Sequence, residues 1–460
     1  MPQPRELFEG LPAPAPGRDA QTIRDLGDGL VLRRACPDDV EAVCAFNAVV
    51  HADPPDWKVT RLVGEWTREL MDGRHPRCCA DDFVLVHDTR RNRLASSLCL
   101  LSHRLRYGDV PFDAGQVELV GTHPDYRRRG LVAAQFAVVH AWSQERGQRL
   151  QLVDGIPWYY RQFGYEMALE EGGHRVAFPA ALETRSEERD PSLRVRPARA
   201  ADAPLIGALY GRGVAGHAVS CERDADFWRY EIEARDPGSM QRKEIRVVER
   251  EGGPPLAVFA HPPILFQGWL HVNLAEVAPD AAWSGVLPTL LHTLRTTADC
   301  LAEAAGPDLR GVIFRLGSEH PIYHAAGRRL AADRPPYAFY VRVPDLPVFL
   351  RLLGPELEAR LAASPLAGHS GELALSFYRS GVRLRLAGGR LEEVSPWTPA
   401  TDDRGDVALP DLTFLQLLFG FRSLDELDTA FPDCFRWQED RAPLVDALFP
   451  KRPSDLWPTL

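Results

Sequence analysis

The sequence predicts a mixed α/β or α+β protein with two similar domains in tandem and a smaller third α+β domain. Strand-like runs alternate with helical runs over the first two thirds of the chain. The plan of residues 26–185 recurs over 192–344, and the pattern changes near residue 345. At 460 residues the chain is long for one hydrophobic core. We therefore expect an N-terminal tail over 1–25 and three domains over 26–185, 192–344 and 345–460.

Elements of the first domain follow from the hydrophobic pattern. "GLVLRRACPDDVEAVCAFN" predicts a strand and then a helix capped by Asp38 or Asp39. "DDFVLVHD" and "LASSLCLLSHRLRY" predict a hairpin across the charged turn "TRRNR", and "GQVELVGT" predicts another strand. An apolar helix is expected from Leu131. A strand in "RLQLVDG", a short helix in "PWYYRQFGY" and a last strand in "HRVAFP" complete the domain.

The second domain repeats this plan with one difference. Three similarities occur in the same order. The positions of Arg33, Ala35 and Asp39 match those of Arg196, Ala198 and Asp202. Further along, "PDYRRRG" matches "PDAAWSG", and "PWYYRQFG" matches "PIYHAAG" in its Tyr-to-Gly spacing. They indicate an internal duplication at a period of about 160 residues, much longer than a solenoid repeat. Where the first copy has three arginines, 127–129, the second has Ala282, Trp283 and Ser284.

The third domain has its own pattern. "DLPVFLRLLGPELEARLAAS" predicts an amphipathic helix, and "GELALSFYRSGVRLRLAGGRLEEV" predicts two or three short strands. "DLTFLQLLFGFRSLDEL" is helical again. These segments predict a compact α+β unit.

Composition excludes several classes of function. A formal net charge of −10 disfavours a broad nucleic-acid or anionic-membrane surface. No apolar run approaches the ~20 residues of a membrane span, and the N-terminus lacks the apolar segment of a signal peptide. The eight cysteines form no C-x-x-C pair and no metal-binding spacing. We therefore expect free thiols, no metal and a cytoplasmic location.

A cluster of positive charge, "RRRG" at 127–130, lies between a strand and the long apolar helix. The first turn of a helix presents unpaired N–H groups and about half a positive charge. Gly130 lets the backbone approach a ligand closely, and arginines add charge-assisted hydrogen bonds. The turn therefore predicts a site for a diphosphate.

Two motifs resemble the GNAT N-acetyltransferase superfamily over about residues 30–180. "RRRGLV" resembles its phosphate motif, with Val132 in place of the usual small residue, and "YRQFGY" from Tyr160 to Tyr165 matches a family signature. The resemblance implies acetyl-CoA as co-substrate, with its pantetheine beside strand 117–122. The implied cofactor-binding residues are Val120, Gly121, Thr122, Arg128, Arg129, Gly130, Leu131, Val132 and Ala133.

The whole plan resembles a narrower group, the Eis-type (enhanced intracellular survival) acetyltransferases. These have an active acetyltransferase domain, a degenerate second copy and a sterol-carrier-like third domain. In this group the C-terminal carboxylate reaches the active site and helps to deprotonate the amine, which implies that role for Leu460. Hexamers occur in the group, so a homo-oligomer is an expectation, although nothing in the sequence gives a number.

Acyl transfer to an amine needs an acid for the leaving thiolate and a base for the amine. Tyr160 matches the family tyrosine and is preferred as the acid over its neighbour Tyr159. Glu118 and His123 are rivals to Leu460 as the base. Three residues lie in the loop expected to cover the acceptor, where they would suit a cationic amine: Asp53, Asp56 and Trp57.

The preferred function is acetyl-CoA-dependent N-acetylation of a primary amine. The acceptor could resemble an aminoglycoside or a polyamine, or be a lysine of a peptide or protein. Two other classes stay open. One is a non-catalytic sensor that binds CoA, acyl-CoA or a lipid on the same scaffold, and the other is a structural subunit of a larger assembly.

Overall fold

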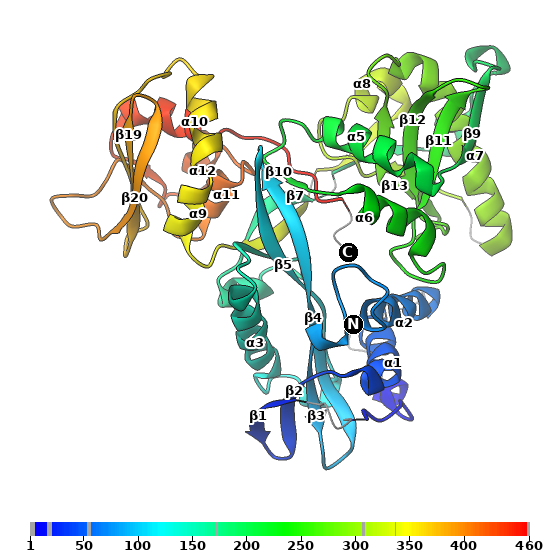
Figure 1. Cartoon of the computed structure of the whole chain (residues 1–460), viewed down its shortest axis with the longest axis horizontal. Coiled ribbons are helices and arrows are strands. Elements are labelled where there is room, and N and C mark those ends of the chain that lie inside the picture. Colours follow the sequence, from blue (N-terminus) through cyan, green and yellow to red (C-terminus); the bar gives the residue numbers. More distant parts are fainter. Residues whose placement is uncertain are drawn as a thin grey trace.

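The computed structural model describes residues 5–15, 21–52, 57–171, 173–305, 309–335 and 337–457. Figure 1 shows the first domain at the centre, the second domain in green on one side of it, and the third domain in yellow to red on the other. A long hairpin of β4 (Arg93–Tyr107) and β5 (Val110–Thr122) forms the middle of the molecule. The first domain therefore contacts both of the others.

The first domain is built on one mixed sheet. Its order begins β1 (Thr22–Gly27), β2 (Leu30–Arg34), β3 (Phe83–Asp88), β4 and β5, and continues with β6 (Leu150–Val153), β17 (Tyr337–Arg342) and β7 (Glu166–Glu171). α1 (Val40–Val50) and α2 (Trp57–Met71) cover one face, whereas α3 (Leu131–Glu145) covers the other (Figure 1). A separate apolar cluster lies beneath each face. The predicted mixed sheet and its helices are therefore observed.

The N-terminal segment is more ordered than the predicted tail. β1 begins at Thr22, inside that tail, and pairs with β2 in antiparallel register. Phe8 is buried, and its ring lies 6.1 Å from that of Phe46 and 4.4 Å from that of His123. The tail was inferred from its prolines, but Phe8 belongs to a core cluster of the domain, and Leu7 and Leu11 pack against the same cluster.

The first two domains exchange their last strands. β8 (His174–Ala177), expected to close the first domain, pairs instead with β15 (Gly311–Phe314) and β16 (Ala331–Arg334) of the second. β17, expected in the second domain, lies between β6 and β7 of the first. The strand pattern shows where strands occur but not which sheet receives them, so the expected boundaries at 185 and 192 cut across both sheets.

The second domain consists of two four-stranded sheets. One has the order β14 (Leu274–Val277), β12 (Pro255–His261), β11 (Glu244–Arg250) and β9 (Leu193–Pro197), and the other has the order β13 (Trp269–Val272), β15, β8 and β16. Its helices include α5 (Ala203–Gly213), α6 (Ala225–Arg229), α7 (Trp283–Ala305) and α8 (Ile322–Ala326). The second domain therefore differs from the first, whose strands form one continuous sheet.

A repeated ion pair supports the duplication. In the first copy Arg33 donates to both carboxylate oxygens of Asp39, at 2.7 Å each. In the second copy Arg196 donates to both oxygens of Asp202, at 2.6 and 3.0 Å. Each pair joins a first strand to the start of the following helix. The matching positions found in the sequence therefore carry the same contact in space.

The third domain is α+β as expected. Its sheet has the order β20 (Arg390–Trp397), β19 (Gly381–Ala387), β18 (Gly371–Ser376), β21 (Val407–Ala408) and β22 (Phe435–Arg436). The single predicted helix is two, α9 (Leu346–Leu352) and α10 (Gly354–Ala362). α11 (Thr413–Leu418), α12 (Leu424–Ala430) and α13 (Ala442–Leu448) complete the domain.

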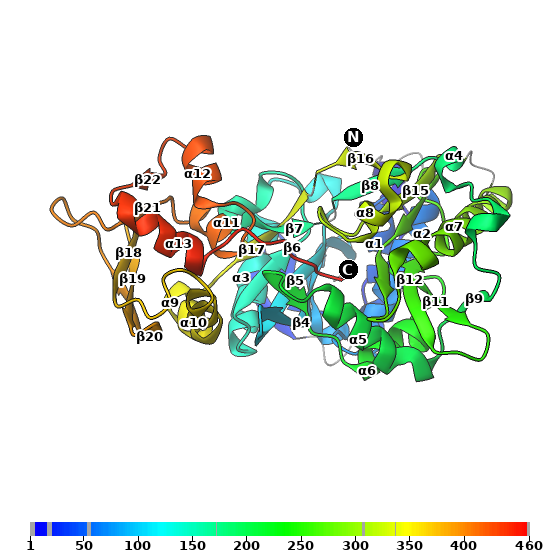
Figure 2. The same cartoon turned by 90° about the horizontal axis from the view of Figure 1, so that it is seen from above.

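Contacts at the tip of the β4–β5 hairpin and along the C-terminal segment help to attach the third domain to the others. At the tip of the β4–β5 hairpin, the Tyr107 hydroxyl donates to the Leu418 carbonyl at 2.6 Å and accepts from Arg360 at 2.8 Å. After α13 the chain leaves the third domain and returns to the centre of the molecule, the red segment in Figure 2. There Asp455 forms a parallel bridge with Ser220. Ser220 belongs to β10 (Val219–Cys221), which pairs with β4. This C-terminal segment therefore lies where the first and second domains meet.

Candidate active site

β5 separates from its neighbour β6 partway along its length. The two strands pair in parallel from Ala114 to Gln116, and β5 then continues to Thr122 without β6, paired only with β4 on its other side. Leu119 has a φ of +54°, and the register against β4 shifts at this point. A bulge of this kind bends the strand and redirects its backbone groups. The predicted pantetheine residues Val120, Gly121 and Thr122 lie on the part of β5 that has left β6.

The arginine-rich turn has the geometry of an anion site. Arg128 and Gly130 have φ values of +62° and +74°, and the first backbone bond of α3 runs from the Ala134 N–H to the Gly130 carbonyl at 3.1 Å. The N–H groups before Ala134 therefore precede the helical ladder. A Cβ on Gly130 would meet nothing within 4 Å, and arginines 127–129 are exposed. Open space, backbone donors and positive charge together fit a diphosphate.

The matching turn of the second copy has no arginine of its own. It begins α7 and lines a pocket whose charged residues are Glu187, Glu188, Arg189, Asp190, Arg250 and Asp280. Arg250 is paired with Asp190. The sequence predicted the loss of the arginines, but not that more acidic than basic side chains line the pocket beside the turn. Of the two copies, only the first suits a diphosphate.

Tyr160 is held in an aromatic setting next to the end of β6. It belongs to the 3₁₀ turn Tyr159–Phe163 and is 6% exposed. Its ring centroid lies 5.7 Å from that of Phe136 in α3 and 5.5 Å from that of Tyr340 in β17. Burial, followed by the nearby Glu118 carboxyl, raises its pKa above the usual value of a tyrosine. The hydroxyl therefore stays protonated at neutral pH, as a proton donor must.

Three carboxyl groups lie near one another, and two of them, Glu118 and Asp154, are close enough to Tyr160 to raise its pKa. Glu118 is 7% exposed and accepts from the Gln116 amide at 2.5 Å. Burial and the charge of Asp154 raise its pKa well above the usual range. Burial also raises the pKa of Asp154, and burial with the charge of Asp154 raises that of Glu171 to about 7. We call Glu118, Asp154 and Glu171 the acidic cluster. Because burial raises the pKa of all three carboxyls, their ionised forms are stronger proton acceptors than an ordinary carboxylate.

Sequence reasoning found Glu118 but missed the other two members. Asp154 directly follows β6, and Glu171 ends β7. Their positions at the ends of strands were visible in the sequence. What was not visible is that β6 and β7 lie on either side of a strand from the other domain, which determines where these ends meet.

The remaining predicted residues have other positions. His123 is buried, and its Nδ1 accepts from the Asp125 N–H at 3.1 Å, so it shapes the turn before α3. Asp53, Asp56 and Leu460 lie outside the described residues, as does the side chain of Trp57, which begins α2.

A cavity of about 160 Å³ adjoins the acidic cluster at Glu171. Its walls come from the end of β7, from the second domain and from the C-terminal segment up to Trp457. Among the residues that the structure describes, no group of three or more His, Cys, Asp and Glu side chains could hold a metal ion. No described helix is both long enough and apolar enough to cross a membrane.

Comparisons with known proteins agree with this geometry. Residues 32–168 match the family profile described as an acetyltransferase (GNAT) domain. A comparison with curated proteins finds no match. Among solved structures, Eis1 from Mycobacterium abscessus is similar with a TM-score of 0.58 and 16% identity, over 92% of this chain and 98% of that one.

Two further structures are similar over nearly their whole lengths. A GCN5-related N-acetyltransferase from Kribbella flavida has a TM-score of 0.57 and 18% identity, over 94% of this chain and 98% of that one. A probable N-acyltransferase from Enterococcus faecalis V583 has a TM-score of 0.62 and 12% identity, over 92% and 96%. This chain therefore contains a GNAT acetyltransferase domain, within a fold that it shares over nearly its full length with Eis1.

Proposed function

We propose that the protein transfers an acetyl group from acetyl-CoA to a primary amine. The observation that carries this proposal is that Tyr160 lies near Glu118 of β5, the strand that leaves β6 and leads into the arginine-rich turn. The proposed diphosphate site and proton acceptor thus belong to β5 and the turn after it, and the proposed proton donor lies beside this strand.

The cofactor-binding residues follow from this arrangement. Backbone N–H groups from Arg128 to Ala133, with the side chains of Arg128 and Arg129, would bind the pyrophosphate. The unpaired edge of β5 at Val120, Gly121 and Thr122 would hold the pantetheine by backbone hydrogen bonds. Bound acetyl-CoA supplies the thioester carbonyl that the amine attacks and the sulfur that leaves.

Tyr160 acts as the general acid in this proposal. A new C–N bond forms as the C–S bond breaks, and the tyrosine hydroxyl gives its proton to the leaving sulfur. Its pKa, raised by burial, keeps that proton in place until the thiolate develops. The ring contacts with Phe136 and Tyr340 fix the direction of the hydroxyl.

The acidic cluster takes the proton that the amine loses. Glu118 is the preferred base, because it lies on β5 next to the bulge and is the cluster member nearest in sequence to the pantetheine residues. The Leu460 carboxylate stays a second candidate from the family resemblance. A base with a raised pKa is suited to operate near neutral pH.

The test is acetyl-CoA-dependent thiol release with a panel of primary amines, alongside thermal unfolding with and without acetyl-CoA. Ligand at 100 times its Kd should stabilise the native protein by ~2.7 kcal/mol. The double variant Arg128→Ala/Arg129→Ala should lose most of this stabilisation. Arg149→Ala/Arg185→Ala removes the same charge from exposed positions elsewhere and should keep it. Equal behaviour of the two variants would place the cofactor away from the turn.

A further inference from the structure

The cavity beside the acidic cluster is lined by residues of the first domain, of the second domain and of the C-terminal segment. The charged or ionisable residues in its lining are Glu170, Glu171, Lys243, His271, Arg315 and Asp455. One ordered water needs a cavity of roughly 10–15 Å³. This cavity of about 160 Å³ therefore accommodates a small molecule rather than a folded protein segment. Glu171 belongs to both the cavity and the acidic cluster, so the reaction site lies at one end of the cavity.

Most charges in this lining are already balanced within the protein. Arg315 forms an ion pair with Glu171, at 3.4 Å from Nη2 to Oε1. Asp455 accepts from the Tyr210 hydroxyl at 3.0 Å. His271 is neutral near pH 7, because burial and the charge of Arg315 lower its pKa to about 4. Among the described residues of this lining, Lys243 is therefore the one cation whose charge is not balanced by a partner.

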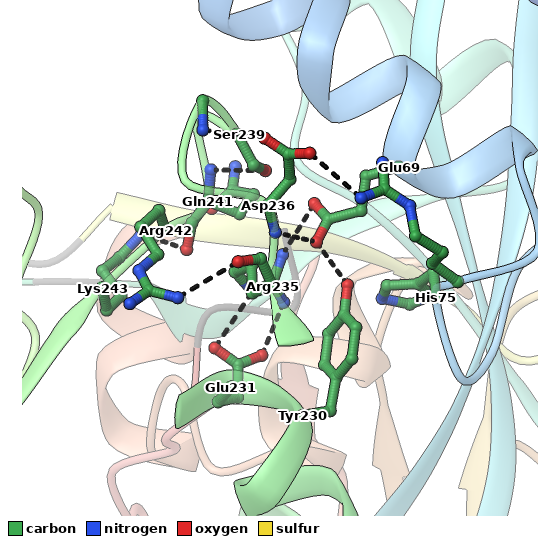
Figure 3. A network of polar contacts seen from close by, with 12 residues as sticks. Glu69, His75, Tyr230, Glu231, Arg235, Asp236, Ser239, Gln241, Arg242 and Lys243 are labelled. Carbon is green, nitrogen blue, oxygen red and sulfur yellow. Dashed lines mark hydrogen bonds and ion pairs between the residues drawn. The ribbon is translucent and has the colours of Figure 1, made fainter. Parts of the chain in front are cut away.

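Lys243 is buried without an anionic partner among the described residues. It is 7% exposed, and its ammonium donates one hydrogen bond, to the Gln241 carbonyl at 3.1 Å. Figure 3 shows that the carboxylate of Glu231 is bonded to Arg235 instead, at 2.5 and 3.1 Å. An ammonium has three N–H donors, so two of them have no acceptor in this part of the chain. Burial lowers its pKa to about 7.

A buried ammonium is costly unless an anion pairs with it. The surrounding ion pairs are complete without Lys243, since Arg235 is paired with both Glu231 and Glu69. Its side chain instead lines the cavity that leads to the acidic cluster. A ligand that brings a negative charge into the cavity would satisfy the free donors and favour the charged form of the lysine.

We propose that the acetyl acceptor is a small molecule that carries an anionic group besides its amine, and that Lys243 binds this group. The inference rests on the proposed function and extends it to the class of acceptor. The amine lies toward the acidic cluster, and the anionic end lies toward the second domain. The degenerate copy thus contributes a binding residue for the acceptor, although its own turn does not suit a diphosphate.

Binding is tested first, independently of turnover. The chain has only three lysines, 58, 243 and 451, so labelling with [¹³Cε]lysine gives three signals, which Lys243→Met and Lys451→Met assign. At pH 7 the Lys243 signal should move toward the charged form with 4-aminobutanoate or 6-aminohexanoate and stay in place with butylamine or hexylamine. No response to either amino acid, or the same response to the simple amines, would overturn the proposal.

Turnover is tested with the same four probes. The wild-type protein should acetylate the amino acids with a kcat/KM about ten- to hundredfold above that for the amines of equal length, as expected for a hydrogen-bonded ion pair. Lys243→Met should lose this preference, and Lys243→Arg should retain much of it. Lys451→Met, which removes an exposed lysine that pairs with Glu426, should behave as wild type.

The outcomes separate the two proposals. Equal or better acetylation of hexylamine by the wild-type protein would overturn the anionic acceptor and leave the acetyltransferase proposal in place. A Lys243 signal that responds to the amino acids without acetylation of any probe would support the anion site and count against the proposed function. A phosphate-bearing amine, O-phosphoethanolamine, shows whether the site prefers phosphate to carboxylate.

Discussion

The ring of Tyr160 lies directly against the backbone of Gly155. A Cβ on residue 155 would be 2.1 Å from Cε2 of the tyrosine, far closer than two carbon atoms can approach. Gly155 follows Asp154 of the acidic cluster, and Tyr337 of the exchanged strand β17 donates to its carbonyl at 3.4 Å. The absence of a side chain at this position therefore allows the acid and the cluster to lie next to each other.

Gly155→Ala should displace the Tyr160 ring without touching the cofactor-binding turn. Because a shift of about 1 Å at a reacting group can cost ~100-fold, we expect kcat to fall by that order. The stabilisation by acetyl-CoA should be unchanged in thermal unfolding. Gly211→Ala, at a helical position where a Cβ meets nothing within 4 Å, is the control and should keep full activity. Unchanged kcat in Gly155→Ala would show that the ring position does not matter.

Tyr160→Phe removes the proposed acid while keeping the ring. We expect kcat to fall by about 10²- to 10⁴-fold, with little change in the KM for acetyl-CoA. Since burial raises the pKa of this tyrosine, the wild-type rate should not decline below pH 10 through loss of its proton. Tyr159→Phe, whose side chain is only half-buried, is the matched control. If both variants lose activity equally, the hydroxyl of Tyr160 is not the donor.

The acidic cluster should make the protein less stable as the pH rises. The pKa of Glu171 is about 7 in the folded protein against 4.5 ordinarily, so between these pH values the native state binds more protons than the unfolded state. The free energy of unfolding therefore falls with rising pH across this window, by at most ~3.4 kcal/mol at 1.36 kcal/mol per pKa unit.

Glu171→Gln removes the ionisable group and should flatten that slope. Urea unfolding at pH 5 and pH 8 measures it: wild type should lose more stability between the two than the variant. Asp190→Asn is a control at an exposed carboxyl whose pKa lies below the usual range. Parallel curves for wild type and Glu171→Gln would mean that Glu171 titrates as in water.

A buried ion pair joins the first two domains and should be sensitive to truncation. Arg235 is 3% exposed and pairs with Glu231 in its own domain and with Glu69 of α2 in the other. Figure 3 shows Tyr230 and the backbone of Asp236 bonded to the same Glu69. Arg235→Met leaves two carboxylates without their cation and should cost ~3–5 kcal/mol.

The matched control for that variant is Arg229→Met, at an exposed arginine one helical segment earlier that pairs with Asp226. Exposed pairs contribute ~0–1 kcal/mol, so its urea midpoint should stay close to that of wild type. A small effect of both variants would mean that water reaches the buried pair.

Much of the fold could be predicted because local patterns determined it. The alternation of "DDFVLVHD" and "LASSLCLLSHRLRY" gave the β3–β4 hairpin, and the positions of Arg33 and Asp39 recurred as Arg196 and Asp202 with the same contact. The pairing partners of the strands could not be predicted in this way. The residues of β8 and β17 show that they are strands, but nothing local shows that each enters the sheet of the other domain.

The candidate site likewise has residues that the sequence predicts and residues that it does not. The turn at 127–130 and Tyr160 could be found because each is a contiguous motif. Asp154, Glu171 and Lys243 could not, because they meet only when strands from two domains and the C-terminal segment come together. Asp154 and Glu171 are ordinary strand-end acids in the sequence, and Lys243 is an ordinary lysine before β11.

The exchange of β8 and β17 makes the first domain depend on the second. β17 is an interior strand, hydrogen-bonded to β6 on one side and β7 on the other, and it carries Tyr340 against Tyr160. A chain cut in the linker near residue 190 would have one fragment with a gap in its sheet and another with an orphan strand. Loss of residues 192–344 would therefore remove β17, and with it the Tyr340 ring that packs against Tyr160. Each of the two sheets is completed only by a strand from the other domain's stretch of sequence.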